Sequence, residues 1–255
     1  MNQSAAHPRV SVCGIGASAG GVEALQHFFG ALAPDLALAY VVIVHLSPDH
    51  KSELPSIISR WTTMPVLQVG DGEKIPLQPD HVYVVAPDRK LEITDSAVGS
   101  SRFEQPRGHR TAIDLFFRSL ADAHGDGFAV LLSGSGSDGA IGARAVKERG
   151  GLVLVQDPRE AMHNGMPRAA IATGVADVVL PAGELAVRLG ELARSKRRMP
   201  GLDAEDDDAD SAAANEDKAL RGVLDVLRKR TGHDFSRYKR NTVLRRLSRR
   251  GEASA

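Results

Sequence analysis

The chain has 255 residues, of which 42% are hydrophobic, which is enough for one large α/β domain with an appendage. Its formal net charge is zero, but its charges are segregated. Residues 199–217 carry eight acidic and no basic side chains, whereas residues 218–250 carry twelve basic side chains and two acidic ones. A single cysteine excludes an intrachain disulfide framework. No apolar run approaches the ~18 residues of a membrane helix and no signal peptide is evident, so we expect a cytoplasmic protein.

Apolar runs of strand length alternate with helical patterns from residue 10 to about residue 195. The expected strands are Val10–Ile15, Ala39–Val44, Val66–Val69, Val82–Val85, Lys90–Ile93, Phe128–Leu132, Leu152–Val155 and Val178–Leu180. The expected helices are Gly21–Leu32, Ser52–Trp61, Thr111–Ala123, Gly139–Arg149, Arg168–Thr173 and Gly183–Ser195. Continuous runs of Val, Ile and Leu predict a doubly wound, mostly parallel sheet with helices on both faces. Residues 62–95 have turn signals but no helical pattern, which predicts a short antiparallel excursion beside that sheet.

The charged part of the chain after residue 195 divides into two segments. Residues 196–217 are acidic, rich in small residues and without apolar periodicity, so we expect a disordered linker. Residues 218–250 have an apolar helical face that is interrupted at His233–Ser236, and they predict a short helical appendage. That segment is too short to build a substantial core alone. We therefore expect a main domain over 8–195, a linker over 196–217 and an incomplete helical segment over 218–250.

Three reactive side chains directly follow expected strands. Ser18 lies in the turn after the first strand, and this turn matches the G-x-S-x-G nucleophile pattern. His45 follows the second strand, and Asp138 follows the strand Phe128–Leu132. Functional residues of doubly wound sheets collect outside the carboxyl ends of the strands. Because an imidazole activates a serine hydroxyl and a carboxylate orients the imidazole, the three residues predict a catalytic triad.

The glycines near Ser18 permit a sharp turn and leave backbone N–H groups free at a helix N-terminus, where a developing oxyanion is stabilised. Ala19 is the first of these candidate donors, and the loop with Ser135 and Gly136 offers a second. Taken singly, each triad residue has a structural alternative. Ser18 and Asp138 are suitable helix N-caps, and a histidine at a strand end can bond to a backbone carbonyl.

A dinucleotide-binding turn is the rival interpretation, because Gly14, Gly16 and Gly20 have a loosely similar spacing. Such a site normally has an acidic residue near the end of the second strand to bind a ribose hydroxyl. His45 stands there instead, which disfavours a nucleotide. The order Ser, His, Asp also disfavours a standard α/β-hydrolase, in which the acid precedes the histidine. The other histidines lack metal-ligand spacing, so we expect neither a metal nor another cofactor.

These motifs closely resemble the catalytic domain of the chemotaxis protein-glutamate methylesterases, the CheB type. The resemblance is carried by GIGASAGGVEAL, VIVHLSPDH, LLSGSGSDGAIG and NGMPRAA, and it spans roughly residues 8–194. It implies hydrolysis of glutamate methyl esters on the cytoplasmic helices of bacterial chemoreceptors, and many members also deamidate receptor glutamines.

By motif position, the resemblance implies Ser18 as nucleophile, His45 as general base and then acid, and Asp138 as the orienting carboxylate. Two positions differ from the residue that is common in the family. Ser135 stands where the family commonly has Met, and Ala19 stands where it often has Thr. A backbone donor is indifferent to its own side chain, so we expect only a modest effect from either.

Ala219–Arg250 resembles the start of the N-terminal helical domain of chemotaxis receptor methyltransferases, the CheR type. In that family this domain helps to recognise the receptor. We expect neither a receiver domain nor a methyltransferase cofactor domain, so the chain resembles a truncated methylesterase–methyltransferase fusion. Aromatic residues are sparse in the basic segment, which favours docking on an acidic receptor surface over nucleic acid. The alternative function is a non-catalytic receptor-binding adaptor.

Overall fold

The computed structural model describes residues 10–44, 53–94, 96–104 and 111–198. Its centre is a seven-stranded sheet with the order β10-β9-β8-β1-β2-β5-β3, and every neighbouring pair is parallel. The strands are β1 (Ser11–Ala17), β2 (Leu38–Val44), β3 (Val66–Val69), β5 (His81–Val85), β8 (Phe128–Leu131), β9 (Leu152–Gln156) and β10 (Val178–Leu180). The predicted doubly wound α/β class is confirmed.

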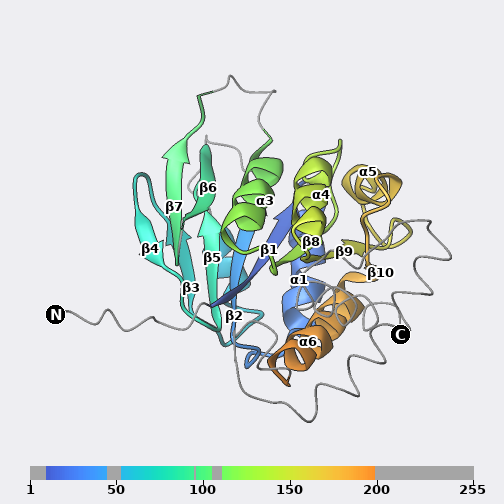
Figure 1. Ribbon diagram of the computed structural model, residues 1–255, viewed down its shortest axis with the longest axis horizontal. Helices are drawn as coiled ribbons and strands as arrows, with labels where there is room; N and C mark the ends of the chain where they lie inside the picture. Colours follow the sequence, from blue (N-terminus) through green and yellow to red (C-terminus); the bar gives the residue numbers. More distant parts are fainter. Residues whose placement is uncertain (1–9, 45–52, 95, 105–110, 199–255) are drawn as a thin grey trace, which may run out of the picture. The chain divides into compact units, whose positions relative to one another are not determined.

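Helices cover both faces of this sheet (Figure 1). They are α1 (Gly21–Ala31), α2 (Leu54–Ile58), α3 (Ala112–Ala123), α4 (Ala140–Glu148), α5 (Gly165–Ala172) and α6 (Ala182–Arg198). One core cluster joins Val12 of β1 and alternate residues of β2 to α3, α4 and α5. Tyr40 points to the opposite face of β2, where its ring meets Phe29 of α1 edge-on at 6.4 Å. All seven residues of β2 are buried, as expected for a strand that is covered on both sides.

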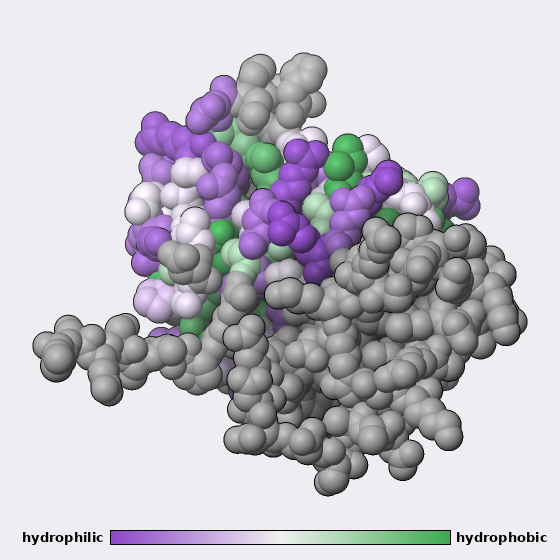
Figure 2. All heavy atoms as spheres, viewed as in Figure 1, coloured by the Kyte–Doolittle hydropathy of each residue, from purple (hydrophilic) through white to green (hydrophobic). Residues whose placement is uncertain are grey.

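The predicted antiparallel excursion is a separate three-stranded sheet of β4 (Lys74–Pro76), β7 (Ala97–Arg102) and β6 (Arg89–Thr94). Its extent differs from the prediction, because β3 and β5 join the parallel sheet and β7 lies beyond residue 95. The sequence signalled neither β4 nor β7, since β4 has only three residues and β7 is made mostly of small or polar residues. In Figure 2 the outer surfaces of this sheet, α3 and α4 are mostly hydrophilic, with scattered hydrophobic side chains.

Three helix boundaries depart from the prediction. α2 is limited to Leu54–Ile58, and α5 begins at Gly165, three residues before the predicted start. Proline needs no N–H partner in the first turn of a helix, so Pro167 is compatible with the earlier start. α6 continues to Arg198, three residues past its predicted end.

The chain divides into two compact units, Met1–Ala193 and Arg194–Ala255. Most of the predicted linker and the whole helical segment after it lie outside the described residues. Among the described helices, none combines the length and apolar character needed to cross a membrane.

Candidate active site

The candidate site lies between β1 and β8, where the order in which strands are added to the sheet reverses. The chain leaves β1 through α1 toward β2, and it leaves β8 through α4 toward β9, although β1 and β8 are neighbours. Ligands of open α/β sheets bind outside the carboxyl ends of the strands at such a switch point. Ser18 directly follows β1, and Asp138 lies between β8 and α4. The structure therefore places two of the predicted site residues after adjacent strands at one sheet edge.

Ser18 stands at a sharp junction between strand and helix. Its N–H donates to the carbonyl of Ser133 at 2.9 Å, which prolongs the hydrogen bonding between β1 and β8 beyond the strands. Its own carbonyl accepts from the N–H of Gly21 at 2.8 Å, which closes a tight turn. The N-cap of α1 is Gly20, with no side-chain capping bond, so the alternative of Ser18 as helix N-cap is wrong. The half-buried Ser18 side chain is thus not committed to capping.

Gly20 is required by this turn for two reasons. Its φ is 69°, in the left-handed region that side chains disfavour. A Cβ there would also lie 2.8 Å from both Ser133 Oγ and Met162 Cβ. The turn therefore packs directly against the loop that follows β8 and against residues before α5.

The loop after β8 is anchored by the fourth motif of the sequence, NGMPR. The N–H of Gly134 donates to the carbonyl of His163, and the N–H of Met166 donates to the carbonyl of Gly134, both at 2.9 Å. A Cβ on Gly165 would lie 2.8 Å from the backbone nitrogen of Gly136. Ser135 and Gly136 are exposed, and Gly136 has a φ of 79°. The motif therefore fixes the path of this loop.

The predicted oxyanion donors have N–H groups that are not used elsewhere in the described part of the chain. Ala19, Ser135 and Gly136 donate no backbone hydrogen bond to any described residue. The neighbouring N–H groups of Ser18 and Gly134 are both engaged by carbonyls. Ala19 belongs to the serine turn, and Ser135 and Gly136 belong to the loop that this turn contacts through Ser133.

Asp138 is held by the N-terminus of a helix other than its own. Its Oδ2 accepts from the N–H of Ile113 at 3.1 Å, and its Oδ1 accepts from the N–H of Asp114 at 2.9 Å, both in the first turn of α3. The N-cap of α4 is Gly139, so the alternative that Asp138 caps the helix it precedes is wrong. Capping across the structure fixes both carboxylate oxygens.

A second carboxyl group lies directly beside Asp138. Asp114 is buried, and its Oδ1 accepts from the N–H of Gly142 at 2.7 Å. Burial raises the pKa of the Asp114 carboxyl above its usual range, the hydrogen bond from Gly142 opposes this, and the charge of Asp138 raises the pKa further. Sequence reasoning missed this residue, because it lies inside a helical pattern with no motif around it.

His45 lies outside the described residues. The strand before it is informative, because Val44, the last residue of β2, is paired with Ala17, the last residue of β1. The strands β1 and β2 therefore end level with each other.

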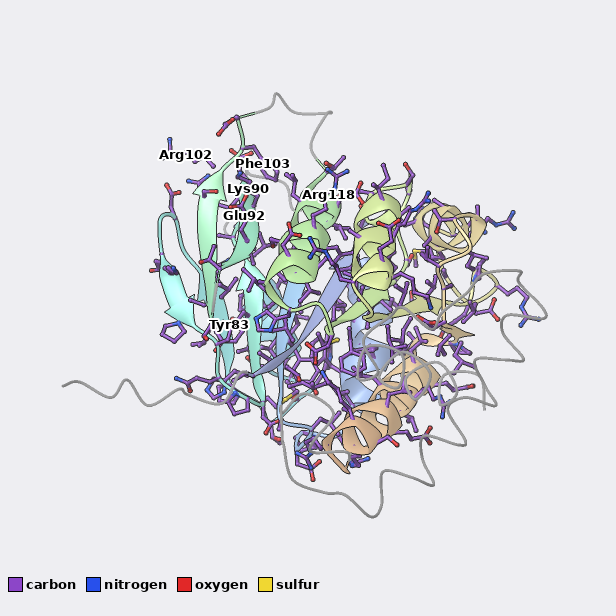
Figure 3. The ribbon with its side chains drawn as sticks, in the orientation of Figure 1. Tyr83, Lys90, Glu92, Arg102, Phe103 and Arg118 are labelled. Carbon is purple, nitrogen blue, oxygen red and sulfur yellow. The ribbon has the colours of Figure 1, made fainter. Side chains whose placement is uncertain are left out.

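Within the described residues, the charged groups of the small sheet pair with one another and do not form a comparable site. Figure 3 labels Lys90, Glu92, Arg102 and Phe103 on and beside the small sheet. Lys90 pairs with Glu92 at 2.9 Å, and Arg102 reaches Asp71 at 3.3 Å, so these charges neutralise one another. Burial raises the pKa of the Cys13 thiol in the middle of β1, which disfavours the reactive thiolate. Within the described ranges, no group of three His, Cys, Asp or Glu side chains suits a metal ion.

The arrangement defines a class of α/β protein with a serine turn and a fixed carboxylate at the switch point. A family model described as CheB methylesterase matches residues 13–189. The solved catalytic domain of the CheB methylesterase of Thermotoga maritima has a TM-score of 0.64 and 29% identity, covering 71% of this chain and 98% of that one. The chain belongs to the CheB methylesterase family. A second model, described as CheR methyltransferase, all-alpha domain, matches residues 218–254.

Curated relatives agree with this assignment. The protein-glutamate methylesterase/protein-glutamine glutaminase 2 of Pseudomonas aeruginosa is 35% identical over 195 residues, which are 74% of this chain and 54% of that protein. The corresponding protein of Geobacillus kaustophilus is 34% identical over 196 residues, which are 74% of this chain and 56% of that protein. The chain thus spans about half the length of these relatives.

Proposed function

We propose that this chain is a serine hydrolase that removes methyl groups from glutamate methyl esters of bacterial chemoreceptors and also deamidates receptor glutamines. The observation that carries the proposal is the serine turn at the switch point, with its N–H anchored on Ser133 and Asp138 fixed after the adjacent strand. The family match and the names of the relatives support the same activity.

In the proposed mechanism, Ser18 Oγ attacks the ester carbonyl while His45 accepts the hydroxyl proton. The carbonyl oxygen becomes an oxyanion, which the N–H groups of Ala19 and of the Ser135–Gly136 loop stabilise. His45 then protonates the departing methoxide, so methanol leaves and an acyl-enzyme remains. Water, deprotonated by His45, hydrolyses this intermediate and releases the free glutamate. For a glutamine substrate the leaving group is ammonia.

Asp138 has the role of holding the imidazole of His45 in one tautomer and stabilising the imidazolium. Each carboxylate oxygen has two lone pairs, so the bonds from Ile113 and Asp114 leave acceptor capacity for a ring N–H. Because the backbone of α3 fixes the carboxylate, the imidazole would be oriented by a rigid partner. No cofactor is needed for this chemistry.

We propose the methylated cytoplasmic helices of a chemoreceptor as the partner, which implies a cytoplasmic location. The proposed domain boundaries are 8–195 for the catalytic domain, 196–217 for an acidic linker and 218–250 for a CheR-type helical segment. The two family matches support this division. The basic segment is proposed to dock on acidic receptor helices rather than on nucleic acid or within a membrane.

The proposal is tested with Ser18→Ala and methylated receptor as substrate. Methanol release by the wild-type chain should fall to background in this variant. Ser59→Ala is a suitable control, because the Ser59 hydroxyl is exposed and donates only to the nearby carbonyl of Pro55. Release that is unchanged in Ser18→Ala would refute Ser18 as the nucleophile.

The adaptor alternative makes the opposite prediction for the wild-type chain. A serine-directed phosphonate would then leave Ser18 unlabelled, and methylated receptor would be bound without methanol release. Labelling of Ser18 together with turnover excludes the adaptor.

A further inference from the structure

We propose that Ser133 is a positioning residue for the nucleophile turn, and that the buried Gln156 sets its position. This inference rests on the proposed function, because it assigns residues that orient Ser18 and the Ala19 N–H. Neither residue belongs to the predicted triad or to the predicted oxyanion donors. Both are buried, with exposed fractions of 1% and 2%.

Ser133 holds both ends of the Ser18–Ala19 dipeptide. Its carbonyl accepts from the N–H of Ser18 at 2.9 Å, and its Oγ donates to the carbonyl of Ala19 at 2.8 Å. The peptide unit between these two anchors contains the Ala19 N–H, the proposed oxyanion donor. A rotation of this peptide unit that turned the N–H away would strain at least one of the two bonds. One residue therefore fixes both the oxyanion donor and the backbone from which the Ser18 side chain projects.

The Ser133 hydroxyl is held from the other side as well. It accepts from the N–H of His163 at 3.0 Å, so its single hydrogen remains for Ala19. The distance from Ser133 Oγ to the carbonyl of His163 is longer, at 3.3 Å, and that carbonyl is already bonded by the N–H of Gly134. The hydroxyl thus joins the serine turn to the segment that leads into α5.

Gln156 fixes the backbone of Ser133. This side chain, at the end of β9, accepts the N–H of Ser133 on Oε1 at 2.7 Å and donates from Nε2 to Glu160 Oε2 at 2.6 Å. Glu160 Oε2 also accepts the N–H of Ala182 at 2.8 Å, at the start of α6. Because the backbone N–H of Ser133 can only donate, the amide of Gln156 has one orientation, with its oxygen toward Ser133 and its nitrogen toward Glu160. These hydrogen bonds therefore link the start of α6 to the nucleophile turn through Glu160, Gln156 and Ser133.

The first experiment compares Ser133→Ala with Ser119→Ala in hydrolysis of a methyl ester. Ser119 is a matched control: its half-buried Oγ accepts the N–H of Ile93 and donates to the carbonyl of Phe116, away from the site. A displacement of about 1 Å at a reacting group costs about a hundredfold in rate. We expect kcat of Ser133→Ala to fall about ten- to a hundredfold with KM changed less than about twofold. Equal kcat in the two variants overturns the proposal.

The second experiment uses pH to restore the contact. In Gln156→Glu, the new carboxylate faces that of Glu160 where the wild-type amide donates a hydrogen bond, and their repulsion should displace Ser133 at high pH. His27 of α1 also faces Glu160, with Nδ1 3.7 Å from Oε1, and because the wild type has the same histidine the result is expressed as a ratio to the wild type. At lower pH one of the two carboxyl groups binds a proton, because the neighbouring negative charge raises its pKa. The protonated group then donates a hydrogen bond to the other, as the amide does in the wild type. The ratio of variant to wild-type kcat should therefore rise as pH falls. A ratio that does not change with pH contradicts the assigned role of Gln156.

Amide hydrogen exchange separates this proposal from the proposed function, because it needs no substrate. The Ser18 N–H should exchange faster in Ser133→Ala than in Ser119→Ala, whose exchange should match the wild type. Unchanged exchange refutes the positioning role even if the chain is an esterase. If Ser133→Ala exchanges faster but the wild-type chain releases no methanol, the catalytic function is refuted and Ser133 remains the residue that holds this turn.

Discussion

At the scale of single residues, Asp138 is both a helix cap and the proposed triad acid, although the helix that it caps is α3 and not the helix that follows it. Its carboxylate caps the N-terminus of α3 through Ile113 and Asp114, while its position after β8 is that expected of a triad acid. The capping is across the fold, so it fixes the carboxylate more firmly than a cap within its own turn would. Structural and catalytic contributions should therefore be separable by choosing the substitution.

Asp138→Asn and Asp138→Ala test this separation. An asparagine retains one acceptor oxygen for α3, whereas alanine loses the cap, at a cost of about 0.5–2 kcal/mol in the free energy of unfolding. Both should lose turnover, because in a well-studied triad the amide lowers kcat on the order of 10⁴-fold. Urea unfolding and methanol release measure the two effects. An asparagine variant that is both stable and fully active would limit Asp138 to capping.

Strand-end reasoning predicted where Ser18 and Asp138 lie, because buried apolar runs mark the strands and the next polar residue marks the edge. It missed Ser133 and Gln156 for a physical reason. Their bonds to Ala19 and to one another join segments 114 and 23 residues apart, and no local pattern encodes such pairs. Gln156 in particular closes an apolar strand and has no motif around it.

At the scale of elements, β1 contains two glycines, Gly14 inside the predicted strand and Gly16 one residue beyond its predicted end. Gly14 and Gly16 lie within the strand and face α3. A Cβ on Gly14 would lie 2.7 Å from the ring of Phe116, and one on Gly16 would collide with the side chain of Ile113. These glycines therefore let α3 approach the sheet closely. Because Asp138 caps α3, this approach also supports the site.

Gly14→Ala should destabilise the fold by about 1–3 kcal/mol, because the added methyl group overpacks a filled core. Gly30→Ala is the matched control. Gly30 is an exposed residue of α1, and a Cβ added there would meet nothing within 4 Å. Alanine there should stabilise the helix by roughly 0.5–1 kcal/mol. Chemical denaturation measures both values, and equal effects of the two substitutions would disprove close packing at Gly14.

Element boundaries were predicted well wherever an apolar run marked the element, and the short strands β3 and β10 were found with the bounds expected. β2 and α3 were found almost to the residue, because each has a continuous buried surface. β4 and β7 were missed, because their register is set by pairing with each other and not by an apolar run. The small sheet is therefore determined by the pairing of its strands and not by a local sequence pattern.

At the scale of the whole molecule, every buried side chain of the described residues lies before the acidic segment. The buried residues of the described chain extend from Val12 to Ala193, and the first compact unit ends at the same residue. α6 contributes the last of them, with Leu185, Leu189 and Leu192 at 0%, 0% and 2% exposure. Gly183 of this helix lies against Ala31 of α1. The core therefore requires α6, whereas residues after it add no member to the described core.

Two truncations follow from this distribution. A chain that ends at Arg198 should keep the thermal midpoint of the full chain and its hydrolysis of a small methyl ester, because it retains every buried residue of the first unit. A chain that ends at Pro181 removes three buried leucines, each worth about 1.5–3 kcal/mol, and should lose cooperative unfolding because this exceeds much of a typical domain's stability. Calorimetry distinguishes the outcomes. A large drop in midpoint for the longer truncated chain would mean that residues 199–255 contribute to the fold of the catalytic domain.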